Sequence, residues 1–195
     1  LPADVPALYH SRSWVTDEEL GHRRLSPPRR RPPGFANALV QNIAGGNTIV
    51  LNPAAAELAH QAAQEAERVV MHDWWLYQIV TGCGGTVVHD DVPGLLYRQH
   101  RGNVIGANRG LRAKARRLRM VLDGSYKRWM ETNLAALSAS AHRFTPENRA
   151  LLRRMGDARP ALLRDRIRML RDMGLYRQSR AAQALLWFSV VINRF

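Results

Sequence analysis

The chain has 195 residues, of which 46% are hydrophobic and 23% are charged. This composition excludes an intrinsically disordered chain and suffices for one domain with a hydrophobic core. The single cysteine, Cys83, excludes a disulfide-stapled scaffold. No apolar stretch approaches the ~20 residues that a membrane-spanning helix needs. The chain starts at Leu1 and shows no basic-then-apolar leader, so we expect a segment without a signal peptide.

Charge divides the chain into two parts. Lysine and arginine number 29 against 16 aspartate and glutamate, which gives a formal net charge of +13. Residues 1–109 carry ten basic and ten acidic side chains, so the whole excess lies in the last 85 residues. We therefore predict a neutral domain over residues 1–110 and a basic extension over 111–195. The extension would attract phosphate groups of nucleic acid, of an anionic membrane or of a substrate.

The first predicted elements follow a proline-rich start. Residues 26–34 are expected to form a loop, because their four prolines lack a backbone donor and restrict their neighbours. A short helix is expected at 35–43 and a buried strand at 47–51. Asn52 and Pro53 then have the pattern of an N-cap and a first helical residue, which predicts an alanine-rich helix reaching about residue 68.

A second helix and two more strands complete the first part. Asp73 is placed to cap a helix over 74–80, and strands are expected at 86–89 and 95–98, separated by a turn that contains Asp90, Asp91, Pro93 and Gly94. A strand, two helices and further strands indicate an α/β fold. From about residue 108 onward the pattern is helical, and Thr145 with Pro146 opens one of the predicted helices.

Several residues admit both a functional and a structural interpretation. Asp73, beside Trp74, is either a partly desolvated base facing a cleft or a capping carboxylate next to core tryptophans. His100 follows a predicted strand, where ligands bind in α/β folds, but a lone histidine is more often a surface residue. The aromatic residues of the basic part recur at helical spacing among leucines, which favours a core role (Tyr126, Trp129, Phe144 and Tyr176).

These motifs, taken in order and spacing over about residues 7–110, resemble the second half of a bacterial family 2 glycosyltransferase of the rhamnosyltransferase-like kind. The residues that carry the resemblance form four groups: Leu8-Tyr-His-Ser11 with Trp14, the segment Ala38–Thr48, His72-Asp-Trp-Trp-Leu-Tyr77 with Gly82–Gly85, and Leu96-Tyr-Arg-Gln-His100 with Asn103, Gly106 and Asn108. The helical part is similar to the variable C-terminal extension of such proteins.

The resemblance implies a partial GT-A fold, that is, an incomplete nucleotide-diphospho-sugar transferase sheet followed by helices. It implies inverting transfer of a sugar such as rhamnose from a UDP- or dTDP-sugar to a cell-surface polysaccharide or lipid-linked glycan. Asp73 would be the general base, and His100 would help to hold a divalent metal, Mg²⁺ or Mn²⁺. The acceptor would lie against Gly45, Gly46 and Asn47, with Trp74 as a stacking platform.

The chain departs from the family pattern because it contains no Asp-x-Asp motif. We therefore expect a segment that begins downstream of that motif and binds donor poorly alone. The expected location is the cytoplasm, with the basic helices touching the inner face of an anionic membrane. The alternative is a non-catalytic module whose cationic helices bind an anionic membrane or nucleic acid, although no nucleic-acid motif is present.

Overall fold

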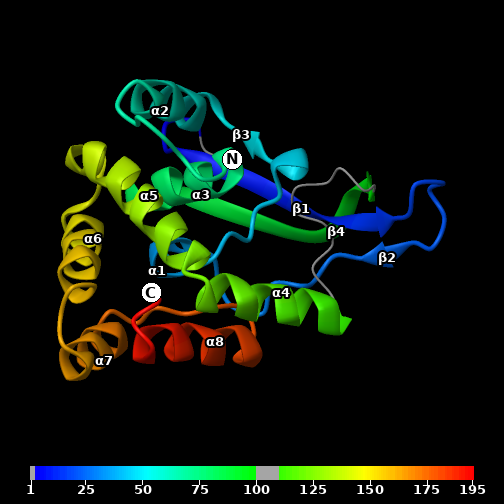
Figure 1. Ribbon diagram of the computed structural model, residues 1–195. Coiled ribbons are helices and arrows are strands. Elements are labelled where there is room, and N and C mark those ends of the chain that lie inside the picture. The colour runs from blue at the N-terminus through cyan, green and yellow to red at the C-terminus, as the bar shows by residue number, and fades with distance from the viewer. Residues whose placement is uncertain (1–2, 100–109) are drawn as a thin grey trace.

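The structure is a computed structural model that describes residues 3–99 and 110–195, and for residues 110–113 it describes the backbone alone. Figure 1 shows two long strands running side by side through the molecule, with helices packed around them. In chain order the elements are β1 (Ala7–Thr16), β2 (Arg24–Leu25), α1 (Phe35–Ala38), η1 (Gly46–Thr48), β3 (Val50–Leu51), α2 (Pro53–Ala63), α3 (His72–Gly82), β4 (Thr86–Arg98), α4 (Gly110–Leu122), α5 (Ser125–Ala139), η2 (Ala141–Arg143), α6 (Pro146–Ala158), α7 (Leu163–Asp172) and α8 (Arg180–Val191).

The sheet is mixed and is centred on β1. Strand β4 pairs with β1 in parallel from Ala7↔Thr86 to Thr16↔Arg98. The short strands β2 and β3 pair antiparallel with β1, near its end and near its start respectively. Because β4 occupies one edge of β1 along its length, β2 and β3 share the other edge. The expected α/β class is confirmed at this level.

The two strands predicted at 86–89 and 95–98 are one continuous strand, so the predicted turn between them is wrong. The residues between them form an irregular bulge, and the register shifts between Ser11↔Asp90 and Arg12↔Pro93. The carboxylate of Asp90 accepts hydrogen bonds from the backbone N–H of Val92 and from the hydroxyl of Tyr9, both at 2.8 Å. Turn-forming residues here bend a strand without ending it.

The starts of α1 and α2 are predicted correctly, and the other boundaries in the first part less well. Asn52 caps α2, since its side chain accepts a hydrogen bond from the N–H of Ala55 at 2.9 Å, but the helix ends at Ala63 rather than near residue 68. The loop over 26–34 is confirmed. The strand predicted at 47–51 is mostly wrong, because η1 occupies its first half and Val50 in β3 is exposed.

One hydrophobic cluster joins the two parts of the chain. Its buried members include Phe35 and Trp74 from the first part and Leu137, Met155 and Leu186 from the helices. A smaller cluster lies between β1 and α3, around Leu8 and Tyr77. The helices α4 to α8 therefore continue the same core, with α5 packed against α3, while the division at residue 110 stays a prediction about domain organisation.

Polar contacts reinforce this junction at two places. The side chain of Gln178, between α7 and α8, accepts hydrogen bonds from the backbone N–H groups of Arg30 and Arg31, each at 2.9 Å. On the other side of the molecule the carboxylate of Glu65 accepts from the guanidinium of Arg143, at 2.6 Å for the shorter contact, and from the hydroxyl of Ser140. The segment between α2 and α3 is thus tied to the end of α5.

Candidate functional site

The side chain of Asp73 lies in the first turn of α3. The helix begins at His72 with Met71 as its N-cap, so the prediction that Asp73 is the capping residue is wrong by two positions. One carboxylate oxygen, Oδ1, accepts a hydrogen bond from the N–H of Trp74 at 2.7 Å, and Oδ2 accepts one from the N–H of Gly46 at 3.1 Å. A negative side chain is favourable at this end of a helix because the unpaired N–H groups carry partial positive charge.

The loop with Gly45, Gly46 and Asn47 lies directly against the start of α3. A Cβ atom placed on Gly46 would lie 2.7 Å from Nε2 of His72 and 3.4 Å from Cβ of Asp73. Gly46 and Asn47 are exposed, and Asp73 is half-buried. The structure therefore brings together the predicted base and the predicted acceptor loop at a surface that a ligand can reach.

The side chain of Trp74 points away from this surface. It is 3% exposed, and its indole N–H donates to the backbone carbonyl of Ala38 at 2.7 Å. A stacking platform needs an open ring face, and Trp74 has none here. The acceptor contact predicted for Trp74 is therefore unsupported by this arrangement, and the core interpretation of this residue holds.

The predicted metal ligand His100 lies outside the described residues. Within residues 3–99 and 110–195, no group of three histidine, cysteine or carboxylate side chains is placed to hold a metal ion.

A buried histidine pair lies in the sheet, between β1 and β4. The rings of His10 and His89 are 4.6 Å apart between centroids, and His10 is fully buried with no hydrogen-bond partner for either nitrogen among the described residues. Burial, together with electrostatic repulsion from His89 and Arg29, lowers the pKa of His10 to about 3. His10 is therefore neutral at physiological pH, and it packs in the sheet as an uncharged ring.

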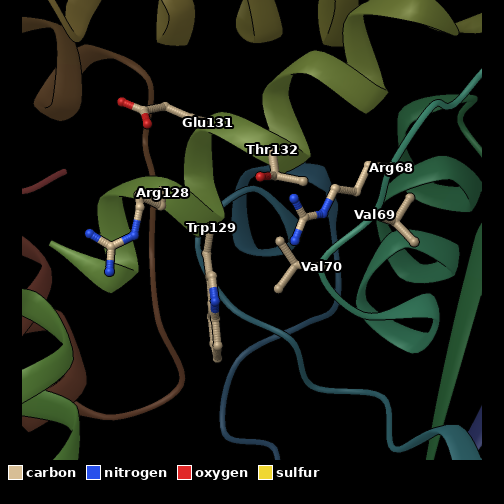
Figure 2. Close-up of a pocket in the computed structure, with 7 residues that line it drawn as sticks. All are labelled: Arg68, Val69, Val70, Arg128, Trp129, Glu131 and Thr132. Carbon is tan, nitrogen blue, oxygen red and sulfur yellow. The ribbon is translucent and has the colours of Figure 1, made fainter.

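A pocket of about 450 Å³ opens beside the start of α3. One wall is the connector between α2 and α3, with Arg68, Val69 and Val70. The other wall is one face of α5, with four lining residues: Arg128, Trp129, Glu131 and Thr132. Figure 2 shows the guanidinium of Arg68 between the two walls, beside Thr132. The sequence interpretation missed this pocket, because it assigned Trp129 to the core from its helical spacing.

Two further observations concern the thiol of Cys83 and whether any helix could cross a membrane. Burial raises the pKa of the Cys83 thiol to about 11, which agrees with a structural rather than a nucleophilic role. Among the described residues, no helix combines the length and the apolar character that crossing a membrane requires.

The chain is similar to the dTDP-rhamnosyl transferase RfbG of Shigella flexneri, with 36% identity over 63 residues. The similarity covers 32% of this chain and 22% of that relative, so the chain matches about a fifth of the relative's length. No protein-family profile matches the chain, and no solved structure matches it significantly. The chain therefore contains a glycosyltransferase-like region.

Proposed function

We propose that this chain is the acceptor-side part of a glycosyltransferase that transfers rhamnose or a similar sugar from a nucleotide-sugar. The observation that carries the proposal is the carboxylate of Asp73, held by two backbone N–H groups from two different elements at an accessible surface. The similarity to a dTDP-rhamnosyl transferase supports the reaction class and suggests the donor. Assignment to family 2 and to the GT-A fold is part of the proposal and rests on the resemblance in sequence.

The geometry suggests how Asp73 would act. Each carboxylate oxygen accepts one hydrogen bond from the protein and keeps a lone pair for the hydroxyl of an acceptor sugar. As that hydroxyl oxygen bonds to the anomeric carbon of the donor, its proton passes to Asp73 and the bond to the diphosphate breaks. The fixed backbone donors keep the carboxylate in one orientation, which is what a general base needs.

The loop at Gly46 has a positioning role in this proposal. Its N–H orients Oδ2 of Asp73, and the absence of a side chain leaves room for the neighbouring His72. Gly45 and the exposed side chain of Asn47 lie on the same loop and are proposed to contact the acceptor. Trp74 is left out of this set, because its ring is buried.

The donor side of the proposal depends on residues that the structure does not describe. By the resemblance, His100 would help to bind a divalent metal that stabilises the negative charge of the leaving diphosphate. Peripheral contact of the basic helices with an anionic membrane, and a glycan or lipid-linked acceptor, also stay predictions.

The test is the substitution Asp73→Asn, which keeps the shape of the side chain and removes its basicity. With dTDP-rhamnose and Mn²⁺, in the protein extended upstream if the chain alone does not turn over, we expect transfer to fall by roughly 10²–10⁴-fold while donor binding is kept. The matched control is Asp157→Asn on α6, an exposed carboxylate remote in sequence from the site. Retained transfer in Asp73→Asn would place the base elsewhere.

Calorimetric titration separates the proposal from the alternative of a binding module. Donor binding by the extended protein but not by this chain would mean that the chain lacks part of the nucleotide site. If neither protein binds UDP- or dTDP-sugars in Mn²⁺, the transferase proposal is contradicted and a non-catalytic module is favoured.

A further inference from the structure

The pocket between the α2–α3 connector and α5 contains polar groups that the described protein leaves free. Among the residues that the structure describes, none forms an ion pair or hydrogen bond with the guanidinium of Arg68, and none bonds the indole N–H of Trp129 or the hydroxyl of Thr132. The ring of Trp129 is half-buried, packed against the core at one side. An aromatic face beside donor and acceptor groups is the combination that binds a sugar ring together with its polar substituents.

The charge in this pocket favours a negatively charged ligand. The carboxylate of Glu131 is paired with the guanidinium of Arg159 at 3.0 Å, so it does not neutralise Arg68. Arg128 donates to neutral partners only, the carbonyl of Asp123 and the hydroxyl of Ser125. In Figure 2 the side chains of Arg128 and Glu131 project away from Arg68, which leaves Arg68 as the cation between the two walls.

The pocket walls are held in place by the rest of the fold. Glu65 fixes the start of the connector to Arg143 and Ser140 at the end of α5. Val69 and Met71 pack against the main hydrophobic cluster on either side of Val70. The site is thus largely formed before a ligand arrives, which reduces the ordering cost of binding.

The pocket also lies close to the proposed base. Val70 lines the pocket and precedes Asp73 by three residues, so their Cα atoms are at most about 11 Å apart. A saccharide of two or three units can span such a distance.

We infer that this pocket is a second acceptor subsite, which rests on the proposed function, and that it binds a saccharide unit carrying a phosphate or carboxylate group. The sugar ring of the ligand lies on the indole of Trp129, and its anionic group bonds to the guanidinium of Arg68. A hydroxyl of the sugar ring bonds to the hydroxyl of Thr132. The subsite would select the acceptor by the unit next to the one that receives the sugar.

Binding measurements on the full chain test this directly. The probes are a rhamnose-containing disaccharide 1-phosphate, a disaccharide with a uronic acid in place of the phosphate, the neutral disaccharide and inorganic phosphate, each titrated by calorimetry. We expect at least one anionic disaccharide to bind more tightly than the neutral one, and inorganic phosphate to bind weakly. The two anionic probes distinguish the two sources of charge.

Substitutions locate the bound probe. Arg68→Gln is expected to weaken binding of the anionic disaccharide about tenfold, because a charge-assisted hydrogen bond is lost. Thr132→Val should weaken it by a smaller factor. The matched control Arg154→Gln removes an exposed arginine on α6 and should leave binding unchanged.

Trp129 needs a pair of variants, because part of its ring packs on the core. Trp129→Ala is expected to weaken binding about tenfold through loss of the stacking surface. Trp129→Phe keeps a ring and should retain most of the affinity with an unchanged melting temperature. Equal loss in both variants, with normal melting, would contradict stacking on this residue.

The results separate this inference from the proposed function. The subsite is overturned if Arg68→Gln and Trp129→Ala leave the affinity for the anionic disaccharide unchanged, or if inorganic phosphate binds as tightly as that disaccharide. This conclusion holds even if Asp73→Asn abolishes transfer. A saccharide site in the pocket is supported if these variants weaken binding of the anionic disaccharide and Asp73→Asn leaves it unchanged. That result supports the site even if no transfer is observed and the proposed function fails.

Discussion

The sheet-bearing part of the molecule and its helical part differ in charge and pattern, yet they share one core. The first part is electrically neutral and carries β1, β4 and the candidate base, whereas the excess of positive charge lies in the helices after residue 110. Their apolar side chains nevertheless pack into the same cluster, with Phe35 and Trp74 beside Leu137 and Met155. The two parts therefore differ in the charge of their side chains, whereas their buried apolar side chains form one common core.

The candidate site draws on both parts of the chain. Asp73, the proposed base, belongs to the first part, and α5 of the second part forms one wall of the pocket. An acceptor that binds both would touch both parts at once. The helices would then contribute to specificity, in addition to any contact with a charged surface.

The strongest test of the shared core is removal of residues 111–195. We expect the remaining chain to lose cooperative folding, because the main cluster loses its partners from α5, α6 and α8. Loss of the near-ultraviolet circular dichroism signal and binding of a hydrophobic dye would report this. A sharp thermal transition in the fragment 1–110 would instead show that the predicted first domain folds by itself.

A pair of glycine substitutions compares the tight turn of the first part with a helix of the second. Gly85→Ala is expected to destabilise the protein by about 1–3 kcal/mol, since its Cβ would lie 2.5 Å from the carbonyl oxygen of Pro6 and 2.8 Å from that of Val80. Gly156→Ala, on α6 with open space around it, should stabilise the protein by about 1 kcal/mol.

Urea unfolding of the two variants measures both effects. A Gly85→Ala variant that is as stable as the natural protein would contradict the predicted destabilisation, because the backbone between α3 and β4 would then have room to move. Unchanged stability in Gly156→Ala would show that this helix gains nothing from a better helix former.

The histidine pair makes the sheet sensitive to acid. Unfolded histidine has its ordinary pKa near 6.5, whereas folded His10 has a pKa of about 3, so the unfolded state binds more protons between these values. Stability is therefore fully present above pH 6.5 and falls as the pH drops toward 3, by up to about 1.4 kcal/mol per pH unit from this residue. The neighbouring charges are those of His89, Arg29, Arg12 and Asp91.

Unfolding free energies at pH 7.5, 5.5 and 4.5 check this slope. His10→Phe keeps a ring, removes the proton site and should reduce the slope by about one proton. His60→Gln on α2 is the control, because His60 is exposed. A slope that His10→Phe leaves unchanged would assign the acid sensitivity to other groups.

Local signals in the sequence predicted two helix caps correctly, whereas the residues of the candidate site came from the resemblance. Asn52 with Pro53, and Thr145 with Pro146, cap their helices as expected, because capping depends on residues within one turn. The contact between Gly46 and Asp73 agrees with the site that the resemblance implied. Its role in catalysis stays a prediction.

The sheet and the pocket were harder to predict, for different reasons. Strand β1 was not recognised, because it buries polar side chains such as His10, Ser13 and Thr16 and lacks a clear alternating pattern. The helical spacing of Trp129 predicts that it packs against the core, which holds for part of its ring, but spacing along one helix cannot show which residues a distant connector leaves uncovered. Both the pairing of β1 and the exposure of Trp129 depend on contacts between residues far apart in the sequence.

The bulge in β4 changes what the outer edge of the sheet offers to a second molecule. Strand β4 pairs with β1 along one edge, and within the described residues no strand pairs with its other edge. A regular 13-residue edge strand would offer a continuous row of free N–H and carbonyl groups to a second molecule. Asp91 and Pro93 interrupt that row with an exposed charge and a missing donor, and both features disfavour pairing with a strand of another molecule.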